Sequence, residues 1–320
     1  MLQNFYSTES IITLAQAPGT LAIISYGDPC QLSGEGVIHC GLPDIEPGPI
    51  QEVWRLSEEQ VEVGRTGNCH WRRGKSLVVI SCIISAEQWQ QVEVASHRAY
   101  RDLLVTANSL GYRHPIRFWN YLPQINQGSG DAEIYKRFCT GRLLAFNEMS
   151  LGEPQFPAAS AVGHHHSDTL ITLFAATAPG QHHQNPAQVN AYHYPREYGI
   201  SSPSFARATS VDLAGQRHLF VSGTASIIGH QTVAEDDLGS QIDNTYKNIQ
   251  RLIAEYGPPA GKFQTIRIYL RHPEHFAEAK AKLAAYFDDT PMIFTQADIC
   301  RDNLLIEVEG LYSQVEGQSH

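Results

Sequence analysis

Two carboxylates near the end of the chain have the clearest potential for chemistry. In an extended strand, successive side chains point to opposite faces, so the run 304–309 separates into an apolar face and an acidic face. The apolar face carries Leu304, Ile306 and Val308, and the acidic face carries Leu305, Glu307 and Glu309. A strand with one solvent-exposed side shows the same alternation. Leu305 and Leu311, however, share the acidic face and favour a partly covered surface, where a carboxyl group keeps its proton to higher pH as a general acid must.

Arginines and tyrosines gather in the segment Tyr194–Arg207, which three breakers mark as a loop, namely Pro195, Gly199 and Pro203. Arginine binds carboxylates through two parallel hydrogen bonds, and tyrosine can orient such a ligand or stack on its ring. Solvated loop arginines are the alternative interpretation. Arg142 and Arg267 are further candidates for an anion site. Arg267 is the stronger of these two, because an arginine between two isoleucines of a predicted central strand needs a specific partner.

The histidines indicate no catalytic metal. His164, His165 and His166 are adjacent, so on an extended chain they point in different directions and offer one or two ligands at most. No HExxH helix accompanies them, and no phosphate-binding loop of the GxxxxGK type is present. We therefore expect neither a metal nor another cofactor.

Composition limits the class of protein. The chain has 320 residues, a hydrophobic content of 42% and a net charge of −10, which favour two domains and argue against nucleic-acid and membrane-surface partners. Residues 1–25 lack the basic start of a secretory leader, and six cysteines occur without a CxxC pair. We expect a soluble cytoplasmic protein, a monomer or small homo-oligomer that binds a small molecule.

A faint internal duplication predicts the fold. A polar turn and buried strand occur at 73–81 and again at 216–222. A helix, a strand, a second helix and a final strand follow each of them, at 86–110, 116–121, 132–146 and 169–175, and at 236–256, 265–270, 274–287 and 303–311. This order predicts an α+β protein with two similar domains, each a mixed sheet with helices packed on one face. Chance similarity is the alternative.

We place the domains as follows. Residues 1–150 form an N-terminal α+β domain, a degenerate copy of the second, and residues 190–320 form the C-terminal domain with the acidic strand. The proline-rich residues 151–189 connect the two domains or cover a site. Only the second copy ends in an acidic strand, which indicates one site and not two.

Several strings carry a resemblance to a known family. They are Arg117–Asn126, Tyr135–Arg142, Tyr194–Arg207, Phe220–His230 and Ala297–Arg301 followed by Glu307. The C-terminal half resembles the YjgF/RidA-like imine deaminase fold, and the whole chain is more specifically similar to the chorismatase family. Chorismatases remove the enolpyruvyl side chain of chorismate, a dianion, without metal or cofactor.

The resemblance implies roles for individual residues. Glu307 stands at the position of the family's general acid, which protonates the methylene carbon of the enol ether. Arg142, Arg207 and Arg267 would bind the two carboxylates of chorismate, and Tyr198 would line its ring. The substrate would lie between the two halves, where interdomain sites commonly form.

Two small residues would decide the product. Members that form 3-hydroxybenzoate resemble this chain in carrying a cysteine at the position of Cys300, whereas hydrolytic members carry small residues at the positions of Cys300 and Ala225. A thiol can relay a proton or exclude water, so the resemblance implies 3-hydroxybenzoate and pyruvate, with 4-hydroxybenzoate left open as a second aromatic product. A small buried hydrophobe is the alternative interpretation of Cys300.

Other functions stay open at this stage. A hydrolytic chorismatase would release a dihydroxycyclohexadiene carboxylate and pyruvate. An imine deaminase or ligand-binding relative of the same fold would act on small enamines and form trimers, and a metal-dependent hydrolase would lose its activity with a chelator.

Overall fold

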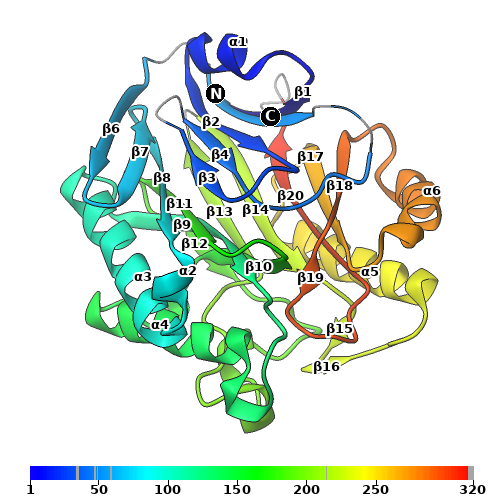
Figure 1. Ribbon diagram of the computed structural model, residues 1–320. Coiled ribbons are helices and arrows are strands. Elements are labelled where there is room, and N and C mark those ends of the chain that lie inside the picture. Colours follow the sequence, from blue (N-terminus) through cyan, green and yellow to red (C-terminus); the bar gives the residue numbers. More distant parts are fainter. Residues whose placement is uncertain (34–35, 47, 49, 58–59, 214, 316–320) are drawn as a thin grey trace.

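The structure of the protein, a computed structural model, describes residues 1–33, 36–46, 48, 50–57, 60–213 and 215–315. These residues form sheets of five, seven and six strands and one two-stranded ribbon (Figure 1). Helices cover the outer faces of the two larger sheets, whereas the inner faces of these sheets meet the five-stranded sheet in a shared core.

The seven-stranded sheet has the order β19-β10-β9-β11-β8-β7-β6. Its strands are β6 (Glu62–Thr66), β7 (Cys69–Arg73), β8 (Leu77–Ile84), β9 (His114–Pro123), β10 (Ala158–His164), β11 (Thr169–Ala176) and β19 (Asp298–Ile299). Helices α2 (Ala86–Trp89), α3 (Val92–Ser109) and α4 (Ile134–Glu148) belong to this half. The first helix begins at Ser85, whose hydroxyl accepts the Gln88 amide while the Gln88 side chain returns to the Ser85 amide.

The six-stranded sheet has the order β12-β13-β14-β20-β17-β18. Its strands are β12 (Gln181–His183), β13 (Ala208–Leu213), β14 (Gln216–Thr224), β17 (Gly261–Leu270), β18 (Met292–Gln296) and β20 (Ile306–Gln314). Helices α5 (Leu238–Tyr256) and α6 (Phe276–Phe287) pack on it, and Asp237 caps the start of α5 by accepting the Ser240 amide. The ribbon joins β15 (Ile227–Ile228) and β16 (Gln231–Thr232).

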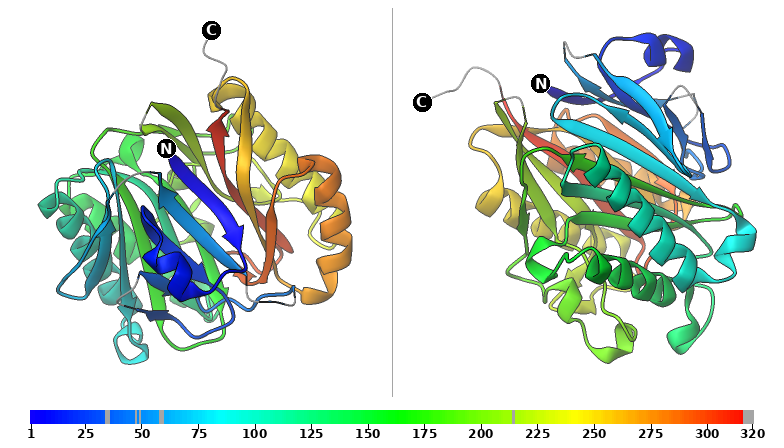
Figure 2. Two further views of the ribbon diagram at one scale, coloured as in Figure 1. Left: turned by 90° about the horizontal axis from the view of Figure 1, so that it is seen from above. Right: turned by 90° about the vertical axis from the view of Figure 1, so that its left-hand side faces the viewer.

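The two larger sheets repeat one topology. The order β10-β9-β11-β8-β7 in the first corresponds to β18-β17-β20-β14-β13 in the second, and in each only the pairs β9/β10 and β17/β18 are parallel. The helices lie on the outer side of each sheet, so that α3 and α4 are separated from α5 and α6 by the strands (Figure 2). The predicted α+β duplication with helices on one sheet face is confirmed.

The domain limits differ from those expected in two places. First, residues before β6 form a sheet of their own, with the order β1-β5-β2-β4-β3. Its elements are β1 (Leu2–Ser7), α1 (Ile11–Gln16), β2 (Thr20–Ser25), β3 (Gln31–Leu32), β4 (Val37–His39) and β5 (Gln51–Leu56). Leu21, Trp54 and other residues of this sheet pack against the inner faces of the larger sheets, whereas α1 packs through Leu14 on Ile23, Val37 and Val53 of the same sheet.

Second, the segment 151–189 is more than a connection. It contains β10 and β11, whose residues are all buried and which lie in the interior of the seven-stranded sheet. Pro154 and Pro157 precede the first residue of β10, so neither proline interrupts the strand. The connection between the halves follows β11 and includes short 3-10 turns, η3 (Ala191–His193) and η4 (Arg196–Tyr198). The other such turns are η1 (Gly130–Ala132), η2 (Glu153–Gln155) and η5 (Pro273–His275).

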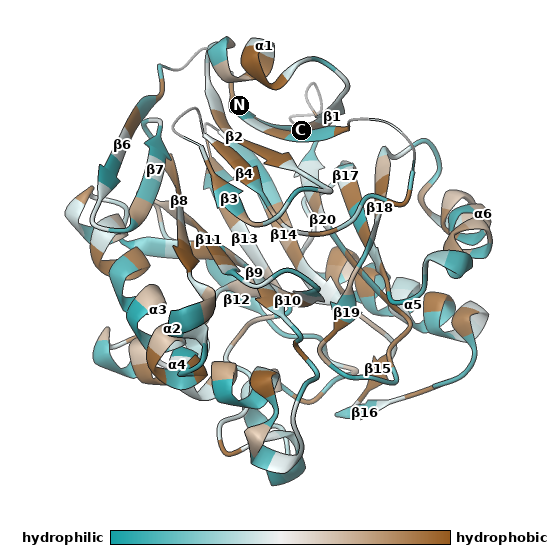
Figure 3. Ribbon diagram, in the orientation of Figure 1, coloured by the Kyte–Doolittle hydropathy of each residue, from teal (hydrophilic) through white to brown (hydrophobic). Residues whose placement is uncertain are grey.

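Hydropathy follows these layers. Apolar residues concentrate on the strands and on the inward sides of the helices, whereas polar residues alternate with them on the outward sides (Figure 3). Among the helices that the structure describes, none has the length and apolar character needed to cross a membrane.

Candidate active site

A cavity of about 650 Å³ lies between the two halves of the duplication. Its walls come from β10 and α4 on one side and from the 194–207 loop, the end of β14 and the start of β20 on the other. Six of the seven predicted site residues line it, namely Arg142, Tyr198, Arg207, Ala225, Cys300 and Glu307. The structure thus brings together residues from both halves that the sequence left far apart.

Glu307 carries the proton-donor prediction, and its surroundings suit that role. It lies on β20 opposite Tyr269 of β17, with 5% of its surface exposed, and its Oε1 has no hydrogen-bond partner among the described residues. Burial, followed by the nearby charge of Glu309, raises the pKa of Glu307 to about 8. The group therefore holds a proton at neutral pH.

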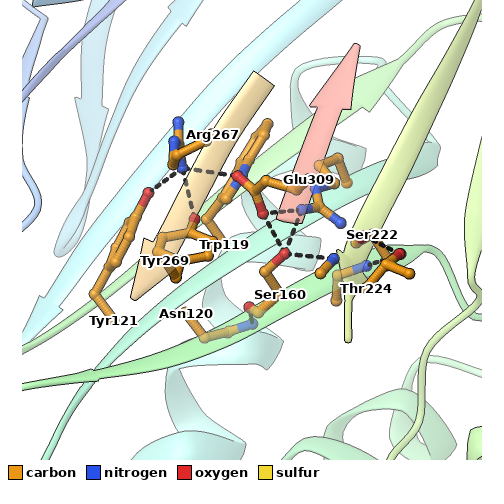
Figure 4. A network of polar contacts seen from close by, with 12 residues as sticks. Trp119, Asn120, Tyr121, Ser160, Ser222, Thr224, Arg267, Tyr269 and Glu309 are labelled. Atoms are coloured by element: carbon orange, nitrogen blue, oxygen red, sulfur yellow. Dashed lines mark hydrogen bonds and ion pairs between the residues drawn. The ribbon is translucent and has the colours of Figure 1, made fainter. Parts of the chain in front are cut away.

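Glu309 has the opposite electrostatic setting although it lies two residues away on the same face. Its carboxylate pairs with Arg117 of β9 at 2.5 Å and with Arg267 of β17 at 2.9 Å, and it accepts the Trp119 indole N–H at 2.7 Å (Figure 4). Its pKa is lowered, because these guanidinium groups and the Ser160 hydroxyl outweigh the effect of burial. Two carboxyl groups whose pKa values are moved apart are typical of a site where one acts as an acid and the other stays ionised.

Ser160 and Gly223 line the cavity and also contact the two acids, Ser160 through Glu309 and Gly223 through Glu307. The Ser160 hydroxyl donates to Glu309, and it accepts from Arg117 and, at 2.8 Å, from the backbone amide of Gly223. The β14/β20 register shifts between Val221 and Thr224, which leaves Gly223 in an irregular stretch. A Cβ atom at Gly223 would lie 2.0 Å from Oε1 of Glu307, so only glycine leaves room for this carboxyl group.

Arg142 and Arg207 supply positive charge to the cavity. They are 1% and 5% exposed, and neither forms an ion pair with a carboxylate in the described part of the chain. Arg207 donates to the Tyr194 hydroxyl at 2.7 Å, Arg142 contacts the Cys139 sulfur at 3.5 Å, and the Nε atom of each arginine has no described partner. A buried guanidinium without a counter-charge is costly, so these groups are suited to an anionic ligand.

The aromatic wall of the cavity contains a residue that sequence reasoning missed. Arg301 also lines the cavity, with its guanidinium 4.1 Å from the ring centre of Tyr198 and 5.2 Å from that of Tyr194. It donates to the carbonyl oxygen of His230 at 2.8 Å, which attaches the turn between β15 and β16 to the segment that joins β19 to β20. Its position directly after Cys300 was the available signal.

Cys300 and Ala225 meet in a small apolar cluster with Ile227, Ile299 and Leu304. Burial, with a smaller contribution from Glu307, raises the pKa of the Cys300 thiol to about 12. The sulfur is therefore a neutral thiol, which can exclude water or exchange a proton but is no nucleophile at neutral pH.

Arg267 does not line this cavity, and its predicted role in binding substrate is corrected by the geometry. Its guanidinium pairs with Glu52 of β5 at 2.6 Å and with Glu309, and it donates to the hydroxyls of Tyr121 and Tyr269. A central-strand arginine did need a specific partner, as the sequence indicated. The partner is the protein itself, because the N-terminal sheet places Glu52 against it.

The histidine run lies elsewhere. His164 is buried at the end of β10, accepts the His166 amide through Nδ1 and lies 3.4 Å from the Cys30 sulfur. In the described ranges, no three His, Cys, Asp or Glu side chains are grouped as a metal site would require. Metal-independent activity stays a prediction.

Comparison with known proteins is consistent with this geometry. Over 315 residues, the chain is 31% identical to a 3-hydroxybenzoate synthase from Streptomyces hygroscopicus, an alignment that covers 91% of each protein. The chain belongs to the chorismatase family. Residues 52–178 match the family model described as Chorismatase FkbO/Hyg5-like, N-terminal. This family member is also 30% identical to a chorismatase from the same organism, over 86% of the chain and 82% of that relative.

A solved chorismatase structure shows that the similarity extends to the whole fold of this family member. That crystal structure is 26% identical in sequence and superposes with a TM-score of 0.85, covering 97% of this chain and 98% of the other. The three-sheet arrangement, including the N-terminal sheet, therefore belongs to the chorismatase fold.

Proposed function

We propose that this chorismatase converts chorismate to 3-hydroxybenzoate and pyruvate, with Glu307 as the general acid. One observation carries the proposal: a single cavity presents a buried carboxyl group, whose Oε1 has no hydrogen-bond partner among the described residues, together with Arg142 and Arg207, two buried guanidinium groups without described carboxylate partners. Chorismate has the matching chemistry, because it offers two carboxylates and an enol ether whose cleavage requires a proton on carbon.

The first step uses the proton of Glu307. Transfer of this proton to the methylene carbon of the enolpyruvyl group leaves an oxocarbenium ion on the substrate and a carboxylate on Glu307. Arg207 lies close enough to lower the pKa of Glu307, so its charge also stabilises the carboxylate that the transfer produces. Glu307 must be protonated to act, hence kcat/KM is expected to be high below pH 8 and to fall above it.

The later steps decide the product. In the aromatising route, the neighbouring ring hydroxyl adds to the cation and releases its proton, which ends on the oxygen that stays on the ring as a hydroxyl group. The bond between the ring and the other oxygen breaks, and that oxygen leaves with pyruvate. The ring then loses a proton, which the Glu307 carboxylate can accept, and no water is consumed. Cys300 and Ala225, in their apolar cluster beside the acid, support this route because they leave little polar surface for an attacking water.

The test is a product assay with purified protein and chorismate in oxygen-18 water containing EDTA. We expect equal amounts of pyruvate and 3-hydroxybenzoate, with no label from water in the pyruvate at early times, before exchange. A dihydroxycyclohexadiene carboxylate with labelled pyruvate would identify a hydrolytic chorismatase instead. Inert chorismate with turnover of small enamines would point to an imine deaminase, and activity lost with EDTA would show a metal requirement.

A further inference from the structure

A chain of buried ion pairs runs from the N-terminal sheet to the cavity wall. Glu52 of β5 pairs with Arg267 of β17 at 2.6 Å, Arg267 pairs with Glu309 of β20 at 2.9 Å, and Glu309 pairs with Arg117 of β9 at 2.5 Å. Each of these four side chains is at most 5% exposed. One charged group from the five-stranded sheet, one from the seven-stranded sheet and two from the six-stranded sheet therefore meet in the shared core.

The charges in this chain of ion pairs balance. Two guanidinium groups face two carboxylates, and further donors hold both anions, since Trp54 and Tyr26 donate to Glu52 while Trp119 and Ser160 donate to Glu309. Glu307 lies next to this chain of ion pairs but is not part of it, because no ion pair joins Glu307 to any described residue. A third buried carboxylate would carry a charge that the network does not compensate.

From this arrangement we infer that Glu309 is a positioning residue that keeps the proton on Glu307, and that Glu52, Arg117 and Arg267 keep Glu309 ionised and in place. The role of the proton rests on the proposed function, whereas the network and its effect on Glu307 do not. The N-terminal sheet thereby contributes to the chemistry of a cavity that it does not line, through Glu52.

Other groups also act on Glu307, and the direction of each is clear. Arg117 and Arg207 favour its ionised form, whereas burial and Glu309 favour its protonated form. Cys300 is a neutral thiol, and Tyr269, which lies opposite Glu307 on β17, is a neutral phenol because burial raises its pKa. The remaining charged residues of the cavity lining are Glu133, Lys136, Arg142, Glu197, Glu235, Arg301 and Asp302. Within the ion-pair chain, the charge of Glu309 favours the protonated form of Glu307. Arg117 keeps Glu309 ionised, but its direct effect on Glu307 is the opposite one and favours the ionised form.

This difference in sign provides the test. In Glu309→Gln the anion is removed while both arginines stay, so the alkaline limb of kcat/KM should move to lower pH by about 1–3 units. In Arg117→Met a cation is removed while Glu309 keeps Arg267, Trp119 and Ser160, so the limb should move to higher pH. Glu52→Gln should move the limb slightly to lower pH, because the positive charge of Arg267 is then less compensated and favours the ionised form of Glu307. Glu62→Gln, which breaks the exposed Arg73–Glu62 ion pair with the same change in net charge, should not move it.

The protonation of Glu307 should also be measured without substrate, by infrared titration of the carboxyl band that disappears in Glu307→Gln. We expect this band to titrate with the same opposite shifts in Glu309→Gln and Arg117→Met. Shifts in one common direction, or none, would overturn the inference. If Glu309→Gln does not fold, Arg117→Met and Glu52→Gln still decide it. Shifted infrared titrations without turnover of chorismate would refute the proposed function and leave this inference standing.

Discussion

The two copies of the duplicated fold differ in chemistry at the central strands of their sheets, β11 and β20. Arg117 of β9 pairs in register with Phe174 of β11, and its counterpart Arg267 of β17 pairs with Glu309 of β20. Phe174 thus occupies in the first copy the position that Glu309 occupies in the second, and Thr172 corresponds to Glu307. Phe174 packs with Trp54 in the shared core, and the Thr172 hydroxyl bonds to Ser81 at 2.9 Å.

This difference shows how one site arises from two similar halves. Both copies keep the arginine, but only the second has a carboxylate for it to meet, so the two arginines converge on Glu309. The first copy has no acid of its own at these positions, yet it supplies Arg117 and Ser160 to Glu309 of the second, and it supplies Arg142 to the cavity wall. The site is therefore a property of the contact between the halves.

The largest expected effect tests the acid and its counterpart in the other copy. Glu307→Gln keeps the shape of the side chain but removes the transferable proton, so kcat with chorismate should fall by about 10²–10⁴-fold or more. Substrate binding should survive. Thr172→Val, the matched change in the first copy, should cost about 1–3 kcal/mol of stability through the lost hydroxyl contact and leave kcat near normal. Near-normal turnover in Glu307→Gln would move the donor role to another group, with Glu309 the first to examine.

The cationic wall should give the next largest effect. Arg207→Ala leaves a substrate carboxylate without its charged partner in a covered site, which costs about 2–5 kcal/mol and corresponds to a loss of affinity of about 30-fold or more. Direct binding of chorismate and of 3-hydroxybenzoate by calorimetry measures this loss. Arg217→Ala, on β14 but outside the cavity lining, is the control and should bind normally. Equal affinity in both variants would place Arg207 outside the substrate site.

A smaller effect is expected at Gly223, whose missing side chain leaves space for the carboxyl group of Glu307. In Gly223→Ala the new methyl group must displace the carboxyl group of Glu307, and a displacement of about 1 Å typically costs about 10²-fold in rate. Steady-state kinetics and thermal unfolding should be measured together. Gly239→Ala on α5, where the nearest atom to a new Cβ lies at 3.4 Å, should change neither. A Gly223→Ala enzyme with unchanged kcat would mean that the acid acts from another position.

The smallest expected change in rate accompanies a change of product. Cys300→Ala combined with Ala225→Gly enlarges the apolar cluster beside Glu307 and removes the thiol, while the acid itself is untouched. Pyruvate should still form at a similar rate, but a dihydroxycyclohexadiene carboxylate should replace 3-hydroxybenzoate, with label from oxygen-18 water in the pyruvate. The rate of pyruvate formation separates altered partitioning from general damage. Unchanged release of 3-hydroxybenzoate would show that these two positions do not select the product.

The local pattern of the sequence was sufficient for most of the repeated elements and for the acidic strand. The period of two predicted that Ile306 and Val308 face the core under the helices and that Glu307 and Glu309 share the other face, and the structure has this arrangement. The order of helices and strands predicted the duplication for the same reason, since periodicity depends on neighbouring residues. The strand β11 was predicted at 169–175, whereas β10 and its counterpart β18 were absent from the predicted order. Residues 158–164 were instead assigned to a proline-rich connection, although every residue of β10 is buried.

The electrostatic difference between the two acids was decided only by the tertiary structure. Glu307 and Glu309 have the same side chain, stand two residues apart and point the same way, so the period of the strand determined that acids lie here but gave no physical reason why one of them keeps its proton. The resemblance to chorismatases pointed to Glu307 without supplying that reason. Arg117 and Arg267 reach Glu309 from two different strands, and Glu52 comes from a third sheet more than two hundred residues away in the chain. Electrostatic energy depends on distance in space, and these distances are set by how the three sheets pack. For that reason Arg267, predicted as a ligand for substrate, is instead a counter-charge inside the protein.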